Sequence, residues 1–299
     1  MELVCNTESA FRLFGQERSL EMIRKAGFTA VDPSLTCMEK PGNPFAGDDW
    51  RDAALEFRRK AENAGLKIVQ THAPFNMNYW GDPEYFRNEI LPTVERSVAV
   101  SGLFGAKVAV VHPLHFLPYH DNAEKLFEMN MEFYRGLIPL CEEYQIRIGV
   151  ENMWQRDPRR RNIVFDVCGT KEEFVRYIDT LNSPWLVATL DVGHVGLPLG
   201  DDEAWDVIRA LGHDRLQSLH IHDNDYMTDQ HTLPYHGKID WAQVCRALGE
   251  IDYQGDFTYE IGAFLHPTMD DEAAQLTLNY MADVGRHLMA LIDRSRPQK

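Results

Sequence analysis

Short apolar runs alternate along the chain with longer amphipathic stretches. The runs are rich in β-branched residues and are bounded by turn residues, a pattern typical of strands buried in a parallel sheet. Eight such runs occur, at residues 2–5, 28–31, 67–70, 107–111, 147–150, 186–190, 216–219 and 256–259. Because an amphipathic stretch follows each run, we expect strands and helices to alternate.

The stretches between the runs carry the signals of helices. Within residues 121–144, apolar side chains recur at mostly helical spacing. Residues 49–64 and 201–211 each begin with acidic side chains, which suit the positive end of a helix. Thr170 and the three residues after it resemble a capping box, and residues 272–292 predict a long final helix.

Eight strands alternating with eight helical stretches predict an α/β fold, the single (β/α)₈ TIM barrel. No linker, low-complexity segment or charge block divides the chain, so residues 1–299 are expected to form one domain. A doubly wound open sheet is the alternative architecture.

Nearly every apolar run ends on a polar residue of a type that binds metals or transfers protons. These residues are Asp32, His72, His112, Glu151, Asp191, His220 and Glu260. Successive members are 40, 40, 39, 40, 29 and 40 residues apart, each interval being one strand, one helix and their loops. Since the carboxyl ends of all barrel strands meet at one rim, we expect these side chains to converge there.

Four of these residues form the central prediction of a metal site. Glu151, Asp191, His220 and Glu260 end four consecutive strands, the fifth to the eighth. Three carboxylates and one imidazole suit a divalent ion such as Mn²⁺, Mg²⁺, Co²⁺ or Zn²⁺. Gathered carboxylates repel one another, and a cation offsets that repulsion. The alternative is a salt-bridged barrel mouth without metal, but few Lys or Arg residues lie near the strand ends.

Further candidates surround these four residues and are predicted to contact substrate or to bind an additional metal. They are His72, His112, His194, Asp229 and His231. His194 follows Asp191 by three residues, and Asp229 and His231 have a spacing that could hold another ion.

Three other groups of residues lie near the predicted strand ends and are expected to play lesser parts in the site. His222 and Asp223 are expected to support the ligands rather than to bind metal themselves. The aromatic residues after strand ends could wall a pocket or simply pack; they are Phe75, Trp80, Trp154 and Phe264. The basic run at residues 156–161 is either a solvated loop or a clamp for an anionic group of the substrate.

Composition and charge narrow the choice of partners. Hydrophobic residues make up 44% and charged residues 25%, the balance of a soluble globular protein. The net charge of −16 disfavours nucleic acid and anionic lipid as partners. The first residues lack the pattern of a signal peptide, and no apolar stretch suits a membrane span. Five scattered cysteines without a CxxC pair fit a reduced, cytoplasmic setting.

Eight short segments that contain or adjoin the candidate residues resemble, in their order along the chain, the xylose isomerase-like barrel superfamily. That superfamily contains sugar isomerases and epimerases, inosose dehydratases and metal-dependent AP endonucleases. The segments are THAPF (71–75), VHP (111–113), GVENM (149–153), LDVGH (190–194), HIHDN (220–224), DQH (229–231), GKIDW (237–241) and YE (259–260). Together they span nearly the whole predicted barrel, and they look most like the sugar phosphate isomerase/epimerase group.

The resemblance implies roles for the candidate residues. In ketose epimerases of this kind the metal ligands correspond to Glu151, Asp191, His220 and Glu260, the two glutamates also act as acid and base, and the histidine at the position of His194 contacts substrate. In the AP endonucleases, which bind three zinc ions, the matching positions are His72, His112, Glu151, Asp191, His194, His220, Asp229, His231 and Glu260. The segment 232–238 lacks the nuclease Gly-Glu-Gly and looks more like the sugar-enzyme loop.

The sequence therefore predicts a divalent-metal-dependent isomerase or epimerase of a sugar, sugar phosphate or keto-sugar. Proton transfer through a metal-stabilised enediolate is the expected chemistry, with Glu151 and Glu260 as acid and base. The alternatives are an inosose-type dehydratase, a multi-zinc phosphodiester hydrolase and a sugar-binding protein without activity. We expect a small carbohydrate as partner, with no nucleic acid and no membrane. Barrels of this kind often pair, which makes a homo-oligomer an open expectation.

Overall fold

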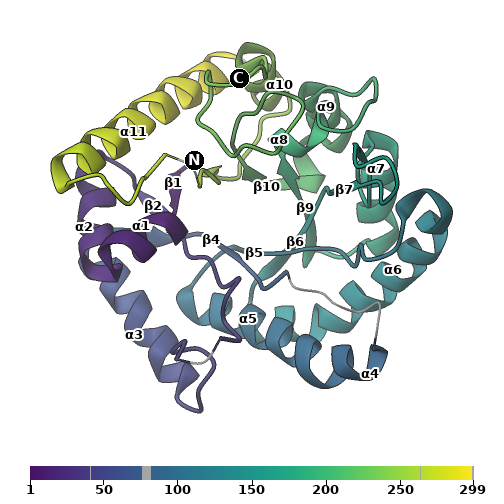
Figure 1. The fold of residues 1–299 in the computed structure, drawn as a ribbon, viewed down its shortest axis with the longest axis horizontal. Coiled ribbons are helices and arrows are strands. Elements are labelled where there is room, and N and C mark those ends of the chain that lie inside the picture. The colour runs from purple at the N-terminus through teal and green to yellow at the C-terminus, as the bar shows by residue number, and fades with distance from the viewer. Residues whose placement is uncertain (41, 76–81, 263, 298–299) are drawn as a thin grey trace.

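The computed structural model describes residues 1–40, 42–75, 82–262 and 264–297, and it confirms the α/β barrel. Its strands lie at the centre with the helices around them (Figure 1). The barrel strands are β1 (Leu3–Asn6), β2 (Ala30–Asp32), β3 (Lys67–Ile68), β4 (Gln70–His72), β5 (Val108–Val111), β6 (Arg147–Glu151), β9 (Leu186–Asp191), β10 (Leu216–His220) and β11 (Phe257–Tyr259). All eight predicted apolar runs are therefore strands.

The strands form two parallel ladders that join into one closed ring. One ladder has the order β11-β1-β2-β3, and the other has the order β10-β9-β6-β5-β4. Strands β3 and β4 are one barrel position interrupted at Val69, so the predicted strand 67–70 in fact continues to His72. A parallel bridge between Ile221 and Tyr259 closes the ring from β10 to β11. All barrel strands consequently point the same way.

The longer helices cover the outside of the ring, as expected of this fold, whereas the four-residue α8 (Val192–Val195) lies at the strand ends, directly after β9. The helices of the described residues follow in chain order. They are α1 (Glu8–Phe14), α2 (Gln16–Ala26), α3 (Trp50–Asn63), α4 (Pro83–Tyr85), the π-helix η1 (Phe86–Ile90), α5 (Leu91–Phe104), α6 (Tyr119–Tyr144), α7 (Lys171–Leu181), α8 (Val192–Val195), α9 (Ala204–Arg215), α10 (Trp241–Glu250) and α11 (Asp271–Arg294). Thr170 caps α7, its side chain accepting a hydrogen bond from the Glu173 backbone N–H at 3.3 Å. In the described part of the chain, no helix is long and apolar enough to cross a membrane.

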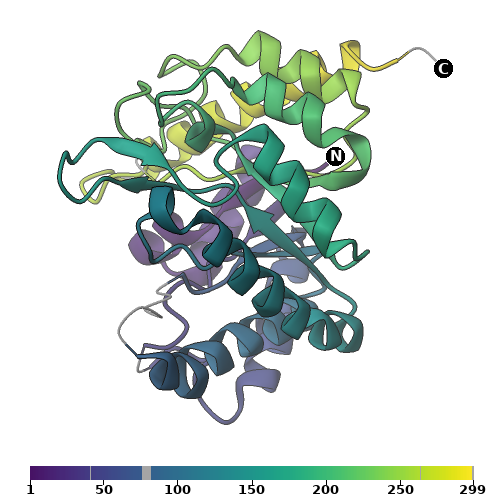
Figure 2. The same ribbon diagram turned by 90° about the vertical axis from the view of Figure 1, so that its right-hand side faces the viewer.

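The sequence did not predict an antiparallel hairpin of β7 (Trp154–Arg156) and β8 (Ile163–Phe165), which follows barrel strand β6. Figure 2 shows this teal hairpin projecting on the side away from the N-terminus, which is where the barrel strands end. The basic run lies on its turn, where Arg159, Arg160 and Arg161 are exposed. The run is thus a solvated hairpin tip.

A polar layer lies inside the barrel below the strand ends. The Gln70 side-chain carbonyl accepts hydrogen bonds from the hydroxyls of Ser218 and Thr258, and its amide donates to the Leu219 carbonyl at 3.3 Å. Space is tight at this level, since a Cβ on Gly149 would lie 1.9 Å from the Thr189 Oγ1. Because these contacts tie the strands together at one level, they also set the level at which the following residues reach the carboxyl-end rim of the barrel.

Candidate metal centre

Four strand ends bring together Glu151, Asp191, His220 and Glu260, here called the tetrad. Each offers one donor atom, and these atoms all lie within 4.8 Å of one another. The His220 Nδ1 lies 3.0 Å from the Glu151 Oε1 and 3.4 Å from the Glu260 Oε2. The structure thus places together the residues that strand spacing singled out, and their role as metal ligands stays a prediction.

The tetrad is a buried charge cluster with one open side. Glu151, Asp191 and His220 are at most 1% exposed, whereas the side chain of Glu260 is 22% exposed. Burial opposes the charged form of His220, but Glu260 and Glu151 outweigh it and raise the pKa of His220 well above its usual value. Burial likewise raises the pKa of Asp191, but His194 and His222 outweigh it and lower that pKa to about 2. The Asp191 carboxylate is therefore held ionised beside imidazole nitrogens.

A second donor set adjoins the tetrad on the side of β4 and β5, and it consists of His72, His112 and Glu151. The Glu151 Oε2 lies 3.1 Å from the His112 Nε2 and 3.7 Å from the His72 Nε2. The His72 Nδ1 is 2.8 Å from the Ala73 carbonyl oxygen, which leaves Nε2 facing Glu151. Burial lowers the pKa of His112 to about 4, so its neutral ring retains a lone pair. Glu151 belongs to both sets, one carboxylate oxygen facing each.

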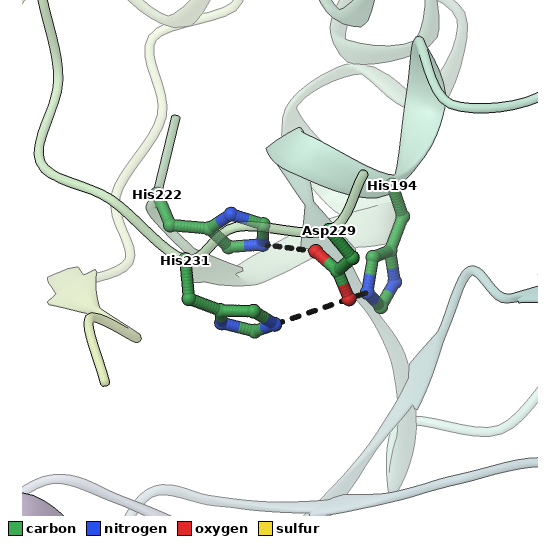
Figure 3. Close-up of side chains that lie close together, drawn as sticks. All are labelled: His194, His222, Asp229 and His231. Atoms are coloured by element: carbon green, nitrogen blue, oxygen red, sulfur yellow. Dashed lines mark hydrogen bonds and ion pairs between the residues drawn. The ribbon is translucent and has the colours of Figure 1, made fainter. Parts of the chain in front are cut away.

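A third donor set consists of His194, His222, Asp229 and His231. Figure 3 shows the Asp229 carboxylate between the three imidazoles. Its oxygens lie 3.2 Å from the His231 Nε2, 3.4 Å from the His194 Nε2 and 3.8 Å from the His222 Nε2. Sequence reasoning gave His222 a supporting role only. In the structure the His222 Nε2 lies 3.0 Å from the Asp191 Oδ2, which fits that role. Its ring also belongs to this donor set and stacks on the His231 ring at 3.9 Å between centroids.

Asn152 contacts one residue of the tetrad and one of the third donor set, and so fixes the two sets relative to each other. Its side-chain amide donates to the Asp191 carbonyl at 3.0 Å and accepts from the Asp191 N–H at 2.8 Å. Its backbone carbonyl lies 2.9 Å from the His194 Nδ1, which directs the His194 Nε2 towards Asp229. The residue directly after Glu151 therefore fixes two neighbouring donors.

The chemistry of these donors fits divalent cations. The Glu151 Oε2 and the Asp229 Oδ1 are buried carboxylate oxygens that receive no hydrogen bond within the described residues, although imidazole nitrogens lie nearby. Buried carboxylate oxygens without a hydrogen-bond donor are costly, and coordination to a cation would satisfy them. Mixed imidazole and carboxylate ligands suit Zn²⁺, Mn²⁺ or Co²⁺ in particular.

All three donor sets contribute to the lining of one cavity of about 600 Å³. Phe75 and Trp154 also line it, as the sequence suggested, whereas Phe264 contacts His236 instead and Trp80 lies outside the described residues. Arg12 is the one Lys or Arg among the described lining residues, so the basic hairpin tip takes no part. The cavity can therefore hold a polar molecule of monosaccharide size.

Asp32 was also predicted to reach the rim but joins none of the donor sets. His115 lines the cavity although the sequence did not point to it. Asp32 ends β2 but lies fully buried, 3.4 Å from the Gln70 amide nitrogen, and burial raises its pKa to about 6. His115 lines the cavity and pairs with Asp166. No sequence signal marked His115, since it lies in a loop three residues beyond His112.

A model of the xylose isomerase-like TIM barrel family matches residues 20–282. The chain belongs to this family. A curated relative, the D-psicose 3-epimerase of Enterocloster bolteae, is 28% identical over 213 residues, which are 69% of this chain and 65% of that protein.

Solved structures agree on the xylose isomerase-like barrel. A D-tagatose 3-epimerase-like protein superposes with a TM-score of 0.74 at 19% identity, covering 98% of this chain and 99% of that one. The IOLI protein, solved with a bound zinc atom, gives a TM-score of 0.72 at 18% identity and full coverage of both chains. At these identities the likeness shows the fold.

The third donor set depends on a close approach that only glycine permits. A Cβ at Gly193 would lie 2.0 Å from the His222 Cε1, so Gly193→Ala must push the ring away from Asp229. We expect this variant to bind about one divalent ion fewer per chain, counted by elemental analysis, while its circular dichroism stays native. Gly136→Ala is the control, because nothing lies within 4 Å of its added methyl group. An unchanged ion count would show that His222 is not needed for binding.

Proposed function

We propose that this protein is a divalent-metal-dependent epimerase or isomerase acting on a ketose or keto-sugar. The observation that carries the proposal is the placement of Glu151 and Glu260, which approach the same nitrogen of His220 from different strands and both line the cavity. Two carboxylates beside one metal site provide one group to remove a proton and another to return it. The similarity to a D-psicose 3-epimerase supports the same class of substrate.

The metal, when bound, would polarise a substrate carbonyl and make the adjacent C–H bond more acidic. Glu151, Asp191, His220 and Glu260 would hold it. One glutamate then takes the proton from that carbon, and the other delivers a proton to the opposite face, which gives the epimer. Delivery to the neighbouring carbon gives the aldose–ketose isomer instead. Loss of a β-hydroxyl group after proton removal would make the enzyme a dehydratase.

The surroundings of the tetrad suit this chemistry. Glu151 is almost fully buried, with the His220 Nδ1 3.0 Å from its Oε1 and the His112 Nε2 3.1 Å from its Oε2, so its carboxylate has little room to turn. Glu260 is partly exposed to the cavity, and its backbone carbonyl lies 2.9 Å from the His231 Nδ1. Trp154 and Phe75 give the cavity apolar surface beside these polar groups.

Phosphoester hydrolysis is the second candidate, and the three adjoining donor sets favour it. Glu151 lies in two of the sets, and a carboxylate shared between ions is typical of sites where two metals hold the attacking and leaving oxygens. The net charge of −16 and the presence of a single Arg among the described residues of the cavity lining argue for a small phosphoester rather than DNA.

Ion counting and deuterium exchange test the two candidates together. Protein purified without chelator is analysed for metal, and its exchange with D₂O is followed by NMR on D-psicose, D-tagatose, D-fructose, keto-inositols and their phosphates. We expect metal-dependent entry of deuterium at the carbon next to the carbonyl, lost with chelator and restored by the ion. Cleavage of p-nitrophenyl phosphate esters or abasic DNA without any such exchange would overturn the proposal in favour of hydrolysis.

A further inference from the structure

His115 and Asp166 form a hydrogen-bonded pair in the wall of the cavity. His115 lies in the loop between β5 and α6, and Asp166 directly follows β8. The His115 Nδ1 is 2.9 Å from the Asp166 Oδ2, and the Asp166 Oδ1 accepts a hydrogen bond from the Val167 backbone N–H at 2.9 Å. Asp166 is fully buried, whereas the side chain of His115 is 27% exposed.

This pairing fixes which His115 nitrogen faces the cavity. Both oxygens of Asp166 are engaged as acceptors, so the His115 Nδ1 must carry the hydrogen between them. In the neutral ring the Nε2 then has a free lone pair. Among the described residues, nothing forms a hydrogen bond with that Nε2, and His115 lines the cavity. A buried carboxylate, which is costly to desolvate, thus orients a ring towards the substrate space.

The position of His115 separates it from the metal donors. Its ring centroid is 6.1 Å from that of His112, and His112 contacts Glu151. His115 itself belongs to none of the donor sets. A sugar held by two neighbouring oxygens at the tetrad has further hydroxyl groups, and these extend away from the metal. His115 is placed to meet one of them.

We propose that His115 is a substrate-binding residue whose Nε2 accepts a hydrogen bond from a sugar hydroxyl remote from the reacting carbon. Asp166 acts as its positioning residue. The inference rests on the proposed function, because it assigns one contact of a polyhydroxylated substrate.

A purely structural role would be that the pair ties the loop after β5 to the end of β8. The variant His115→Asn separates the two roles, because its amide nitrogen can still donate to Asp166 while nothing replaces Nε2. His115→Gln instead can place an amide near the Nε2 position. If the pair only connects the two loops, His115→Asn should leave KM unchanged and His115→Gln should raise it. If His115 contacts substrate, the reverse is expected.

The kinetic test uses the exchange assay above, on the ketose that the wild-type enzyme turns over. We expect His115→Asn to raise KM about tenfold with little change in kcat, since a hydrogen bond to a remote hydroxyl contributes to binding more than to chemistry. His115→Gln should recover part of this loss. Asp166→Asn should also raise KM, because it releases the ring to its other tautomer. His120→Asn, at an exposed position of α6, is the control.

A second readout needs no substrate. Long-range ¹H–¹⁵N spectra of histidine rings report the tautomer, and the His115 signals are assigned by their absence in His115→Asn. We expect the Nδ1–H form in the wild type and its loss in Asp166→Asn. An Nε2–H form, or an unchanged KM in His115→Asn beside a working wild type, would overturn this inference alone. Absence of exchange by the wild type on every sugar would overturn it together with the proposed function.

Discussion

Glu151→Gln should abolish proton exchange and weaken metal binding at the same time. The Glu151 carboxylate faces His220 with one oxygen and His112 with the other, and it belongs to two donor sets. An amide has a single oxygen and no charge, so it cannot supply both. We expect the exchange rate to fall by at least about 10³-fold, since both an acid–base group and a ligand are lost. Ion counting should show fewer than half of the wild-type ions.

Glu260→Gln tests whether proton exchange can be lost while the metal stays bound. Glu260 is a member of neither the second nor the third donor set, although its Oε2 lies 3.7 Å from the His231 Nδ1 and it also groups with His72 and His220. Its remaining amide oxygen can still face His220. Exchange should therefore fall as steeply, while most of the bound metal and sugar is retained. Glu142→Gln, on the exposed side of α6, serves as the control. Exchange at the wild-type rate in either active-site variant would rule out the scheme with two glutamates.

The barrel and the tetrad could be predicted because both follow from periodicity. Parallel strands buried on both faces have nearly continuous apolar sequences, and the first polar residue after each run marks the rim. Glu151, Asp191 and His220 obey this rule, each being the last residue of its strand. Asp32 obeys it in sequence, yet its side chain is buried beside Gln70. The pattern fixes the height of a strand-end residue but not the direction in which its side chain points.

The loops after the strands could not be predicted in the same way. The hairpin β7–β8 has strands of only three residues each, too short for any alternation to stand out. The pair of His115 and Asp166 joins two such loops, 51 residues apart. His222 was expected to support the ligands, and its Nε2 lies 3.0 Å from the Asp191 Oδ2. The bridge at Ile221 keeps the chain extended beyond β10, so His222 lies on the same side of the chain as His220.

The segment GKIDW at residues 237–241 gains a physical explanation from the structure. Gly237 lets the chain pass close to the Asp223 carboxylate, because a Cβ there would lie 2.3 Å from the Asp223 Oδ1. The Ile239 N–H and the Trp241 indole N–H both donate to Asp223, and Asp240 caps α10. The resemblance that this segment carried thus reflects the anchoring of the loop that bears Asp229 and His231.

Asp223→Asn should be the most destabilising of the substitutions considered, although it conserves volume. The Asp223 carboxylate is fully buried and accepts four hydrogen bonds, two on each oxygen. The donors are the backbone N–H groups of Asn224, Tyr235 and Ile239 and the Trp241 indole, at 2.8 to 3.1 Å. Whichever way an amide turns, its NH₂ group faces two donors. We expect a loss of about 3–5 kcal/mol in the free energy of unfolding.

In a thermal melt this loss corresponds to a Tm lower by roughly 10 °C for a domain of this size. Because Asp223 anchors the segment 224–240, the loop carrying Asp229 and His231 should also loosen, and the third donor set should bind its ion more weakly than the tetrad does. Ion titration of the folded variant at low temperature measures this difference. Asp214→Asn, at an exposed position of α9, should leave both Tm and metal affinity unchanged. A loss of stability in Asp223→Asn without any weakening of the third set would show that this set is built independently of its loop anchor.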